Sequence, residues 1–279
     1  MTKPLIDGDI LLYELGYCGE YIDEDGEKQI REWEFVRELT DLKVTEICES
    51  VFNTEEPTLY FTGHESIIRV WNNVRRDSRR DYLPNFRLGI ASKKGYKAQR
   101  HNEKPFHYYN ILAYLLSKHD AKLAIGIEAD DLLAIDQTEN TIICSRDKDL
   151  RQVGGWHYSW PCGRQAAFGP ELVNNLGYLK INSNKLMGVG LKFFYAQCLM
   201  GDPVDNIPGL PKYGPVKTFN LLNNCETEVE LFEVVQTCYK IVYGEEWSEH
   251  LLEQARLVWM VRSVNEDGSP VMYNFPEVV

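Results

Sequence analysis

The sequence predicts an α/β protein with a parallel central sheet and flanking helices, joined to a smaller helical domain. Two observations predict this class. Short strand patterns alternate with helical patterns in the first part of the chain, which is the order of a parallel sheet with crossover helices, and strand signals fade from residue 182 onward. We therefore expect an α/β domain over residues 1–180 and a helical domain over residues 181–279.

The first element is a short buried strand at Leu5–Ile6. It ends in an acidic turn, Asp7-Gly8-Asp9, and apolar residues follow at 10–13. Residues 33–52 carry apolar side chains at helical spacing, and residues 57–62 are rich in aromatic and β-branched side chains. Strand, helix and strand in this order indicate a parallel sheet.

The same alternation continues downstream, and the later elements are helical. We expect a helix at 108–117, a strand at 122–127, a helix at 129–137, a strand at 141–145, and helices at 186–199, 216–222, 228–242 and 249–262. A double turn with several Pro and Gly residues covers 201–214, and Pro215 stands at the first turn of the helix after it.

The composition excludes several classes of protein. The 279 residues are 44% hydrophobic and 26% charged, as in an ordinary globular protein. The longest apolar run, residues 111–116, is far below the ~20 residues of a membrane-spanning helix. The N-terminus shows no apolar signal-peptide core, so we expect a cytoplasmic protein, and we expect it to be a monomer.

The seven cysteines form no regular framework, since no CxxC pair is present. We expect reduced and mostly buried thiols. A zinc pair formed by His157 and Cys162 is the weaker alternative, because no second pair accompanies it.

Positive charge is concentrated in one stretch of an acidic chain. The net charge is 30 − 42 = −12, whereas residues 67–104 contain seven Arg and four Lys against three acids, which gives +8. Aromatic residues are interleaved with these cations. Because aromatic faces stack on bases while cations hold phosphates, we expect the stretch to bind nucleic acid, with Lys93, Lys94 and Tyr96 among the contacts.

Acidic residues occur where parallel sheets place their ligand sites, directly after predicted strands. Three sets follow strands, and a fourth follows the first helix of the second domain: Asp7; Glu128, Asp130 and Asp131; Asp147 and Asp149; Asp202 and Asp205. Any single member, Asp130 or Asp131 for example, has an alternative role as a helix N-cap. Together they predict a shared acidic site.

Carboxylates gathered in one small volume require a cation, since each close pair repels by roughly 4 kcal/mol at an effective dielectric constant of about 20. Hard oxygen ligands without nearby Cys or His favour Mg²⁺ or Mn²⁺ over zinc. Two such ions about 4 Å apart are the arrangement that supports phosphodiester hydrolysis. The substrate would be a polyanion, in agreement with the basic stretch.

Two further segments fit a phosphate-containing substrate. Lys97 and Arg100 stand three residues apart at a predicted helix start, where both side chains could reach the same scissile phosphate. Residues 206–218 combine turn glycines with a helix N-terminus. There Gly209 and Gly214 would permit close backbone approach to a phosphate, with Lys212 and Lys217 as point charges. The alternatives are surface residues and a structural helical hairpin.

Taken in order, five motifs resemble those of the 5′-nuclease (flap endonuclease) family, which includes the bacteriophage 5′→3′ exonucleases and the 5′-nuclease domain of bacterial DNA polymerase I. The motifs are LIDGD (5–9), YKAQR (96–100), IEADDLLAI (127–135), SRDKDL (145–150) and GDPVDNIPGLPKYGPVKT (201–218). The last motif is the most specific. The short chain is most similar to the phage enzymes, which would place it in a host cytoplasm.

The resemblance implies a PIN-like nuclease core with a basic arch or gateway at about residues 65–107, and a helix-turn-helix clamp on duplex DNA that can hold K⁺ through backbone carbonyls. It implies that the eight acids named above bind metal, and that Lys97 and Arg100 form the basic pair at the base of the arch. One position departs from the family pattern: the Asp usually found after Gly63 is replaced by His64 and Glu65. Either Glu65 reaches the ion, or one metal position is weakened.

The sequence therefore predicts a Mg²⁺-dependent 5′→3′ exonuclease on duplex DNA, with Mn²⁺ as a substitute ion and with 5′ flaps and RNA primers on DNA as further substrates. Three alternatives stay open: a flap endonuclease as the main activity, a DNA-binding module without catalysis, and a PIN-type ribonuclease acting on RNA alone. The acids argue against a pure binder, because a binder would gain from losing negative charge beside phosphates.

Overall fold

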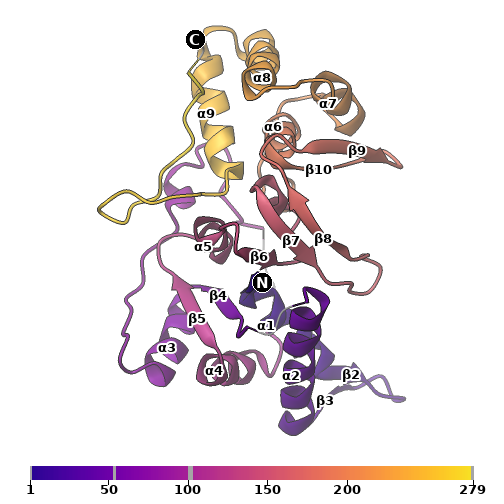
Figure 1. Cartoon of the computed structure of the whole chain (residues 1–279), viewed down its shortest axis with the longest axis vertical. Helices are drawn as coiled ribbons and strands as arrows, with labels where there is room; N and C mark the ends of the chain where they lie inside the picture. Colours follow the sequence, from indigo (N-terminus) through magenta and orange to yellow (C-terminus); the bar gives the residue numbers. More distant parts are fainter. Residues whose placement is uncertain (1, 53–54, 100–102, 278–279) are drawn as a thin grey trace. The chain divides into compact units, whose positions relative to one another are not determined.

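The structure is a computed structural model that describes residues 2–52, 55–99 and 103–277 (Figure 1). The chain forms two compact units that are interleaved along the sequence. The first comprises Met1–Asn85, Asn102–Arg146 and Trp156–Glu171, and the second comprises Phe86–His101, Asp147–Gly155 and Leu172–Val279. The domain division at 180/181 stays a prediction.

The first unit is built on a mostly parallel sheet with the strand order β5-β4-β1-β6-β7-β8. Its strands are β1 (Lys3–Asp7), β4 (Thr58–Thr62), β5 (Asp120–Ala124), β6 (Thr141–Cys144), β7 (Gly155–Ser159) and β8 (Phe168–Val173). The pairs β1–β4, β1–β6, β4–β5 and β6–β7 are all parallel. The predicted α/β class with a parallel central sheet is confirmed.

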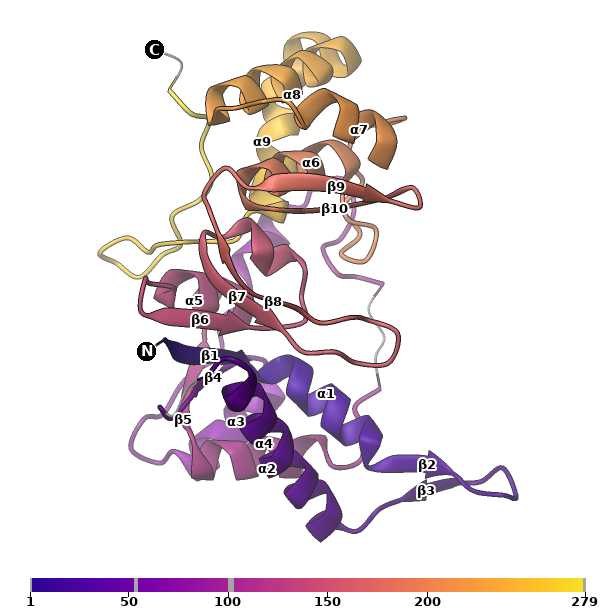
Figure 2. The same ribbon diagram turned by 45° about the vertical axis from the view of Figure 1, so that its right-hand side comes forward.

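Five helices cover this sheet: α1 (Gly8–Cys18), α2 (Trp33–Ser50), α3 (Glu65–Val74), α4 (Tyr108–Lys118) and α5 (Ala129–Asp136). Figure 2 shows α1 to α4 on one side of the strands and α5 on the other. A hairpin of β2 (Glu20–Ile22) and β3 (Lys28–Ile30) follows α1.

The core of the first unit lies between the sheet and the helices α1 to α4. Ile6, Leu11, Ile47 and Phe61 are fully buried there. Each large apolar side chain buried in this way contributes about 1.5–3 kcal/mol relative to exposure. The packing fixes the edge of the sheet at which the parallel strands end, and the acidic residues follow at that edge.

The second unit is organised around α6 (Gly190–Met200), which is buried on nearly all sides. Its other elements are β9 (Tyr178–Asn182), β10 (Lys185–Val189), α7 (Pro215–Leu222), α8 (Glu228–Tyr243), α9 (Trp247–Val258), and short 3₁₀ helices at Phe86–Gly89, Asp149–Gln152 and Gly244–Glu246. The helices α7, α8 and α9 and the β9–β10 hairpin all contact α6.

Three predicted boundaries are wrong. The helix expected from residue 186 begins at Gly190, because residues 185–189 pair with β9 as an antiparallel strand. The strand expected at 122–127 is β5, which ends at Ala124. No acidic turn follows the first strand: β1 runs to Asp7, whose side chain accepts a hydrogen bond from the Ile10 amide (3.3 Å) and thereby caps α1.

The last helix also ends earlier than expected, at Val258 rather than at residue 262. The buried Arg87 guanidinium donates to the carbonyls of Leu257 (3.3 Å) and Trp259 (2.6 Å). A tertiary donor thus satisfies carbonyl groups at a helix end that would otherwise lack partners.

All seven cysteines are free thiols in the structure, and four of them are buried. Among the described residues, no helix is long and apolar enough to span a membrane.

The turn Gly201–Gly209 depends on two glycines packed against each other's backbone. Gly201 has φ = 74° and Gly209 has φ = 64°. A Cβ atom on Gly209 would lie 2.3 Å from the carbonyl carbon of Met200, and one on Gly201 would lie 2.3 Å from the Ile207 oxygen. Only glycine fits at these two positions, where each residue has a positive φ and the backbone segments lie in close contact.

Replacing Gly209 by alanine should lower the free energy of unfolding by about 2–4 kcal/mol, because left-handed backbone and overpacking each cost about 1–3 kcal/mol. Gly214→Ala is the matched control. A Cβ atom added to Gly214 would meet no other atom within 4 Å, and its φ of −82° is ordinary, so the loss should stay below about 1 kcal/mol. Urea denaturation followed by tryptophan fluorescence measures both, and equal losses would contradict the packing argument.

Candidate active site

In the first unit, Asp7 is buried at the end of β1, where a hydroxyl group and an amide group donate hydrogen bonds to it. Its Oδ2 accepts a hydrogen bond from the Ser145 hydroxyl (2.7 Å), and its Oδ1 accepts the Ile10 amide. Ser145 follows β6, the neighbouring strand. Neighbouring parallel strands therefore bring Asp7 and Ser145 together, as the sheet topology requires.

Asp9 is a second acid at this edge, and it was not among the residues predicted from the sequence. Its carboxylate accepts two hydrogen-bond contacts from the Thr62 amide at the end of β4 (3.0 and 3.2 Å). Burial raises the pKa of Asp9 above its usual value, although the bonds from Thr62 oppose this. The signal was present in the sequence, as the second Asp of Asp7-Gly8-Asp9.

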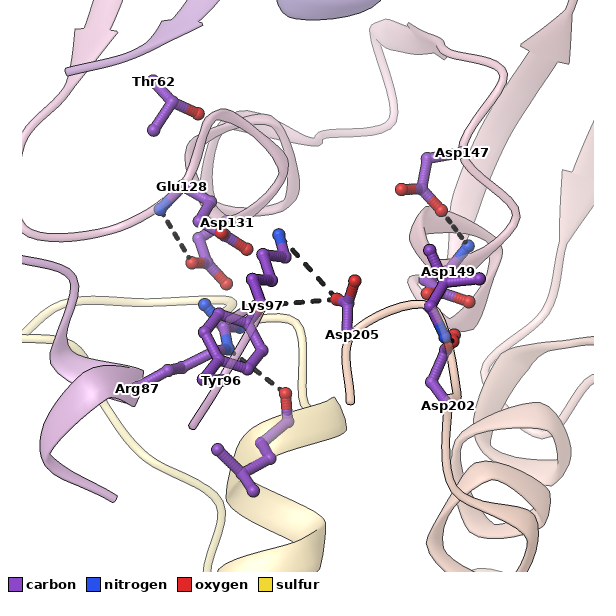
Figure 3. Close-up of polar contacts among 12 residues, drawn as sticks. Thr62, Arg87, Tyr96, Lys97, Glu128, Asp131, Asp147, Asp149, Asp202 and Asp205 are labelled. Atoms are coloured by element: carbon purple, nitrogen blue, oxygen red, sulfur yellow. Dashed lines mark hydrogen bonds and ion pairs between the residues drawn. The ribbon is translucent and has the colours of Figure 1, made fainter. Parts of the chain in front are cut away.

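The acids at the start of α5 are placed by helix capping. The Glu128 amide donates to Asp131 Oδ2 (3.1 Å), and the two residues form a reciprocal capping box (Figure 3). The Ala129 amide donates to Thr62 Oγ1 (3.0 Å), which fixes the helix start against β4. Asp131 is fully buried and caps the helix, the alternative role that its sequence position allows, whereas Glu128 and Asp130 are half-buried.

His64 and Glu65 occupy the position where the family usually has an Asp after Gly63. His64 is the N-cap of α3, and Glu65 is the first residue of this helix. A metal role for Glu65 stays a prediction.

In the second unit, Asp147, Asp149 and Asp202 are joined by short contacts. Asp147 Oδ1 accepts the Asp149 amide (2.8 Å), which holds the loop after β6 in a tight turn (Figure 3). The ammonium of Lys148 lies 3.2 Å from Asp149 Oδ1 and 3.1 Å from Asp202 Oδ2. The turn after β6 and the turn after α6 thus meet around one lysine.

The two paired acids differ in pKa. Burial and the negative charge of Asp147 raise the pKa of Asp149 to about 8. Burial acts in the same direction on Asp202, but the attraction of Lys148 outweighs it and lowers the pKa of Asp202 below its usual value. At both aspartates the positive charge of Lys148 therefore opposes the effect of burial.

Two buried glutamines hold Asp149 in place, and neither was predicted from the sequence. Gln197 Nε2 donates to Asp149 Oδ1 (2.7 Å), and Gln197 Oε1 accepts from Gln152 (3.1 Å). Gln152 in turn bonds the Val258 carbonyl (2.9 Å) and the Met260 amide (3.1 Å). Such a connected network fixes the orientation of the carboxylate. A neutral Gln within an apolar helix gives no local signal of this role.

Lys97 lies against Asp205, the second acid of the turn after α6. Its ammonium is 3.8 Å from Asp205 Oδ2, and its amide donates to the Asp205 carbonyl (3.1 Å; Figure 3). Tyr96 contacts the same carboxylate through its hydroxyl (3.5 Å). The predicted helix start is wrong: residues 96–99 form a turn, and Lys97 has φ = 53°. Arg100 lies outside the described residues.

The remaining candidate DNA contacts are distributed over the second unit. Lys93 and Lys94 line an open pocket with Tyr243 and Asn206, and the Lys93 ammonium donates to the Tyr243 hydroxyl (3.2 Å). Lys217 lies 3.4 Å from the centre of the Tyr213 ring. Gly214 precedes α7 in open space, whereas Gly209 is packed within the Gly201–Gly209 turn, and Lys212 has a positive φ.

The chemistry of these donors fits a hard divalent cation. Within residues 2–52, 55–99 and 103–277, no three Asp, Glu, His or Cys side chains are gathered as a ready metal site. The observed pair, Asp149 and Asp202, offers carboxylate oxygens only, and its negative charge is balanced by an ammonium. A buried carboxylate pair that requires a positive charge suits Mg²⁺ or Mn²⁺ better than zinc.

Comparison with solved structures shows which class of protein has this fold. The chain has the fold of the 5′-nucleases, so the resemblance noted in the sequence is confirmed at the level of the fold. No family model and no characterised protein matches the chain by sequence.

Two matched structures come from bacteriophage T5. The D15 protein co-crystallised with metal ions has a TM-score of 0.51 and 15% identity, over 92% of this chain and 89% of that one. The T5 5′-exonuclease with bound zinc has a TM-score of 0.50 and 13% identity, over 93% of this chain and all of that one (100%).

The turn at residues 95–99 is tied to Asn206, and this contact can be tested directly. Asn206 donates to the Gly95 carbonyl (2.9 Å) and accepts from Gln99 (3.1 Å). Asn206→Gly removes both bonds without straining the backbone, since Asn206 has φ = 62°. We expect trypsin to cleave after Lys93, Lys94 and Lys97 several-fold faster, because loss of local bonds promotes local opening.

The control for this variant is Asn224→Gly, which alters an exposed asparagine that follows α7. Its cleavage pattern should equal that of the wild type. Unchanged cleavage in Asn206→Gly would show that the turn is held by other contacts.

Proposed function

We propose that this protein is a divalent-metal-dependent 5′→3′ exonuclease that hydrolyses phosphodiester bonds at the 5′ end of duplex DNA. The observation that carries the proposal is the arrangement around the turn after α6 in the second unit. Asp202 of this turn forms a charge-requiring pair with Asp149 around Lys148, and Asp205 of the same turn contacts Lys97. The shared fold with the 5′-nucleases supports it, as do the divalent ions found with the T5 proteins.

The proposed ligands are the eight acids predicted from the sequence, with Asp9 as a further candidate. They would hold two Mg²⁺ ions, which Mn²⁺ can replace. When bound, such ions supply the positive charge that activates water and stabilises the leaving oxygen in phosphodiester hydrolysis. The acids of the first unit lie at the C-terminal end of β1 and at the N-terminus of α5. Those of the second unit lie in the turns after β6 and α6.

The other residues bind and orient the substrate. The Lys97 ammonium, held by Asp205, donates to a non-bridging oxygen of the scissile phosphate and offsets the charge that develops there. Arg100 acts with it. Lys93 and Lys94 contact the strand that carries the 5′ end, while Lys212, Lys217 and the amides after Gly214 hold the duplex backbone. Tyr96 is buried with its hydroxyl on Asp205, so it would act by holding Asp205 beside Lys97 rather than by stacking on a base. Gln197 keeps Asp149 oriented toward its ion.

We further propose that the protein acts as a cytoplasmic monomer, that RNA primers annealed to DNA and 5′ flaps are additional substrates, and that the turn at residues 201–218 takes up K⁺ when it grips DNA. Flap cleavage as the main activity is the second candidate, favoured by the basic residues between 67 and 104. These two activities differ in their products, which can be separated by length.

Replacing Asp147 and Asp149 together by asparagine should abolish cleavage of 5′-labelled duplex DNA. DNA binding should persist or tighten, because negative charge beside the phosphates is removed. The control is Asp25→Asn, an exposed aspartate between β2 and β3, which should retain wild-type turnover. Cleavage and gel-shift assays with and without a chelator measure both properties. Retained turnover in the double variant, or an activity indifferent to the chelator, would refute the metal-dependent nuclease.

The length of the released product distinguishes exonuclease from flap endonuclease. On a flap substrate labelled at its 5′ end, an exonuclease releases labelled mononucleotides, and a flap endonuclease releases a labelled oligomer. We expect mononucleotides as the main product. A parallel reaction on single-stranded RNA tests the ribonuclease alternative, since cleavage of RNA but not of duplex DNA would favour it.

A further inference from the structure

Lys148 is the residue between the two aspartates of the SRDKDL motif, and its ammonium lies between carboxylates from two different turns. It is 3.2 Å from Asp149 Oδ1 and 3.1 Å from Asp202 Oδ2. The two carboxylate side chains are only 14% and 5% exposed. The lysine therefore supplies positive charge at a position where two poorly solvated carboxylates need it.

We propose that Lys148 is a built-in counter-ion that occupies the cation position between Asp149 and Asp202 in the metal-free protein, and that it leaves this position when a divalent ion binds. The inference rests on the proposed function, because it takes these two aspartates as metal ligands. It goes further by assigning a role to a lysine that neither holds metal nor touches the substrate.

Competition follows from the oxygens that are involved. A divalent ion ligated by Asp149 and Asp202 needs the carboxylate oxygens that the Lys148 ammonium contacts in this structure. Two cations a few ångströms apart repel strongly where water is scarce. Since the divalent ion carries twice the charge of the ammonium, it is the stronger partner for the two carboxylates. The lysine and the ion therefore exclude each other from this position.

The structure allows Lys148 to leave without disturbing the core. Its side chain is 56% exposed, and the backbone of residue 148 has ordinary helical angles at the start of the Asp149–Gln152 turn. The aspartates, by contrast, are fixed by neighbouring donors: Gln197 holds Asp149, and the Val204 amide holds Asp202 (2.8 Å). The flexible side chain of Lys148 can thus move while the two aspartates stay in place.

One consequence is a predictable cost to metal affinity, since an incoming ion must first displace the ammonium. The other is stability of the metal-free state, because the ammonium prevents two partly buried carboxylates from facing each other without a counter-ion. Removing the positive charge should therefore change the two properties in opposite directions, which a purely structural lysine would not do.

Lys148→Met replaces the lysine by an unbranched side chain that is one atom shorter and carries no charge. After treatment with EDTA, we expect this variant to bind Mn²⁺ in calorimetry roughly ten-fold or more tightly than the wild type, in the range that residues bordering metal ligands typically control. Without metal, the variant should have a lower melting temperature than the wild type. Saturating Mn²⁺ should make this difference in melting temperature smaller. Lys185→Met, at an exposed position of β10, is the matched control and should change neither property.

The wild-type protein provides a second measurement that does not depend on a variant. Acetylation of Lys148 by an amine-reactive ester, followed by mass spectrometry, should become several-fold faster when Mg²⁺ is added, because the ion releases the ammonium from its two partners. Acetylation of Lys185 should stay constant.

Two results overturn the inference, and they differ in what else they affect. In the first result, the wild type binds Mn²⁺ and cuts DNA, but Lys148→Met binds Mn²⁺ no more tightly than the wild type, or Mg²⁺ leaves the acetylation rate of Lys148 unchanged. Lys148 is then not a competing counter-ion, and the nuclease assignment stands. If neither protein binds Mn²⁺ and the wild type does not cut DNA, the proposed function fails and the inference fails with it.

Discussion

The compensation of negative charge at partly buried positions is the constraint on which the rest of this structure depends. The chain carries a net charge of −12, and its acids stand at the ends of β1, β6 and α6 and at the start of α5. In the first unit, the Ser145 hydroxyl donates to Asp7 and the Glu128 amide donates to Asp131. In the second, the Lys148 ammonium lies against both Asp149 and Asp202. A lysine between two poorly solvated carboxylates marks a place where a cation is required.

The sequence predicted the central elements of the fold because their patterns are local. The helices α2, α4, α5, α7 and α8 and the strands β4 and β6 lie where periodicity placed them. The errors arise where tertiary contacts decide. The segment 185–189 continues into the apolar helix α6, and only its pairing with β9 makes it a strand. The end of α9 is set by Arg87, which is 170 residues away from Leu257 in the sequence.

The candidate site divides in the same way. Acids at strand ends could be predicted, since parallel topology gathers such positions at one edge. Asp9 was missed beside a predicted acid, although the DGD motif carried it. Gln152, at the end of a short 3₁₀ helix, and Gln197, within the apolar helix α6, could not be found. An uncharged side chain has no sequence pattern that separates an amide that orients a carboxylate from any other buried polar residue. The conformation of Lys97 was also unpredictable, since it follows from contacts with residues 205 and 206.

The turn between Gly201 and Gly209 explains why its motif is so specific. Asp202 and Asp205 stand three residues apart in this turn, and each contacts a lysine from a distant segment, Lys148 and Lys97 respectively. The distance between the two lysines is therefore set by the shape of the turn, which the glycine pair and the mutual backbone bonds of Asp202 and Ile207 (2.8 and 2.9 Å) hold fixed. A change in that shape would move both contacts together, the lysine proposed to hold a phosphate and the pair proposed to bind a metal ion. The motif must therefore satisfy backbone packing and two charge pairs at once, and few sequences do so.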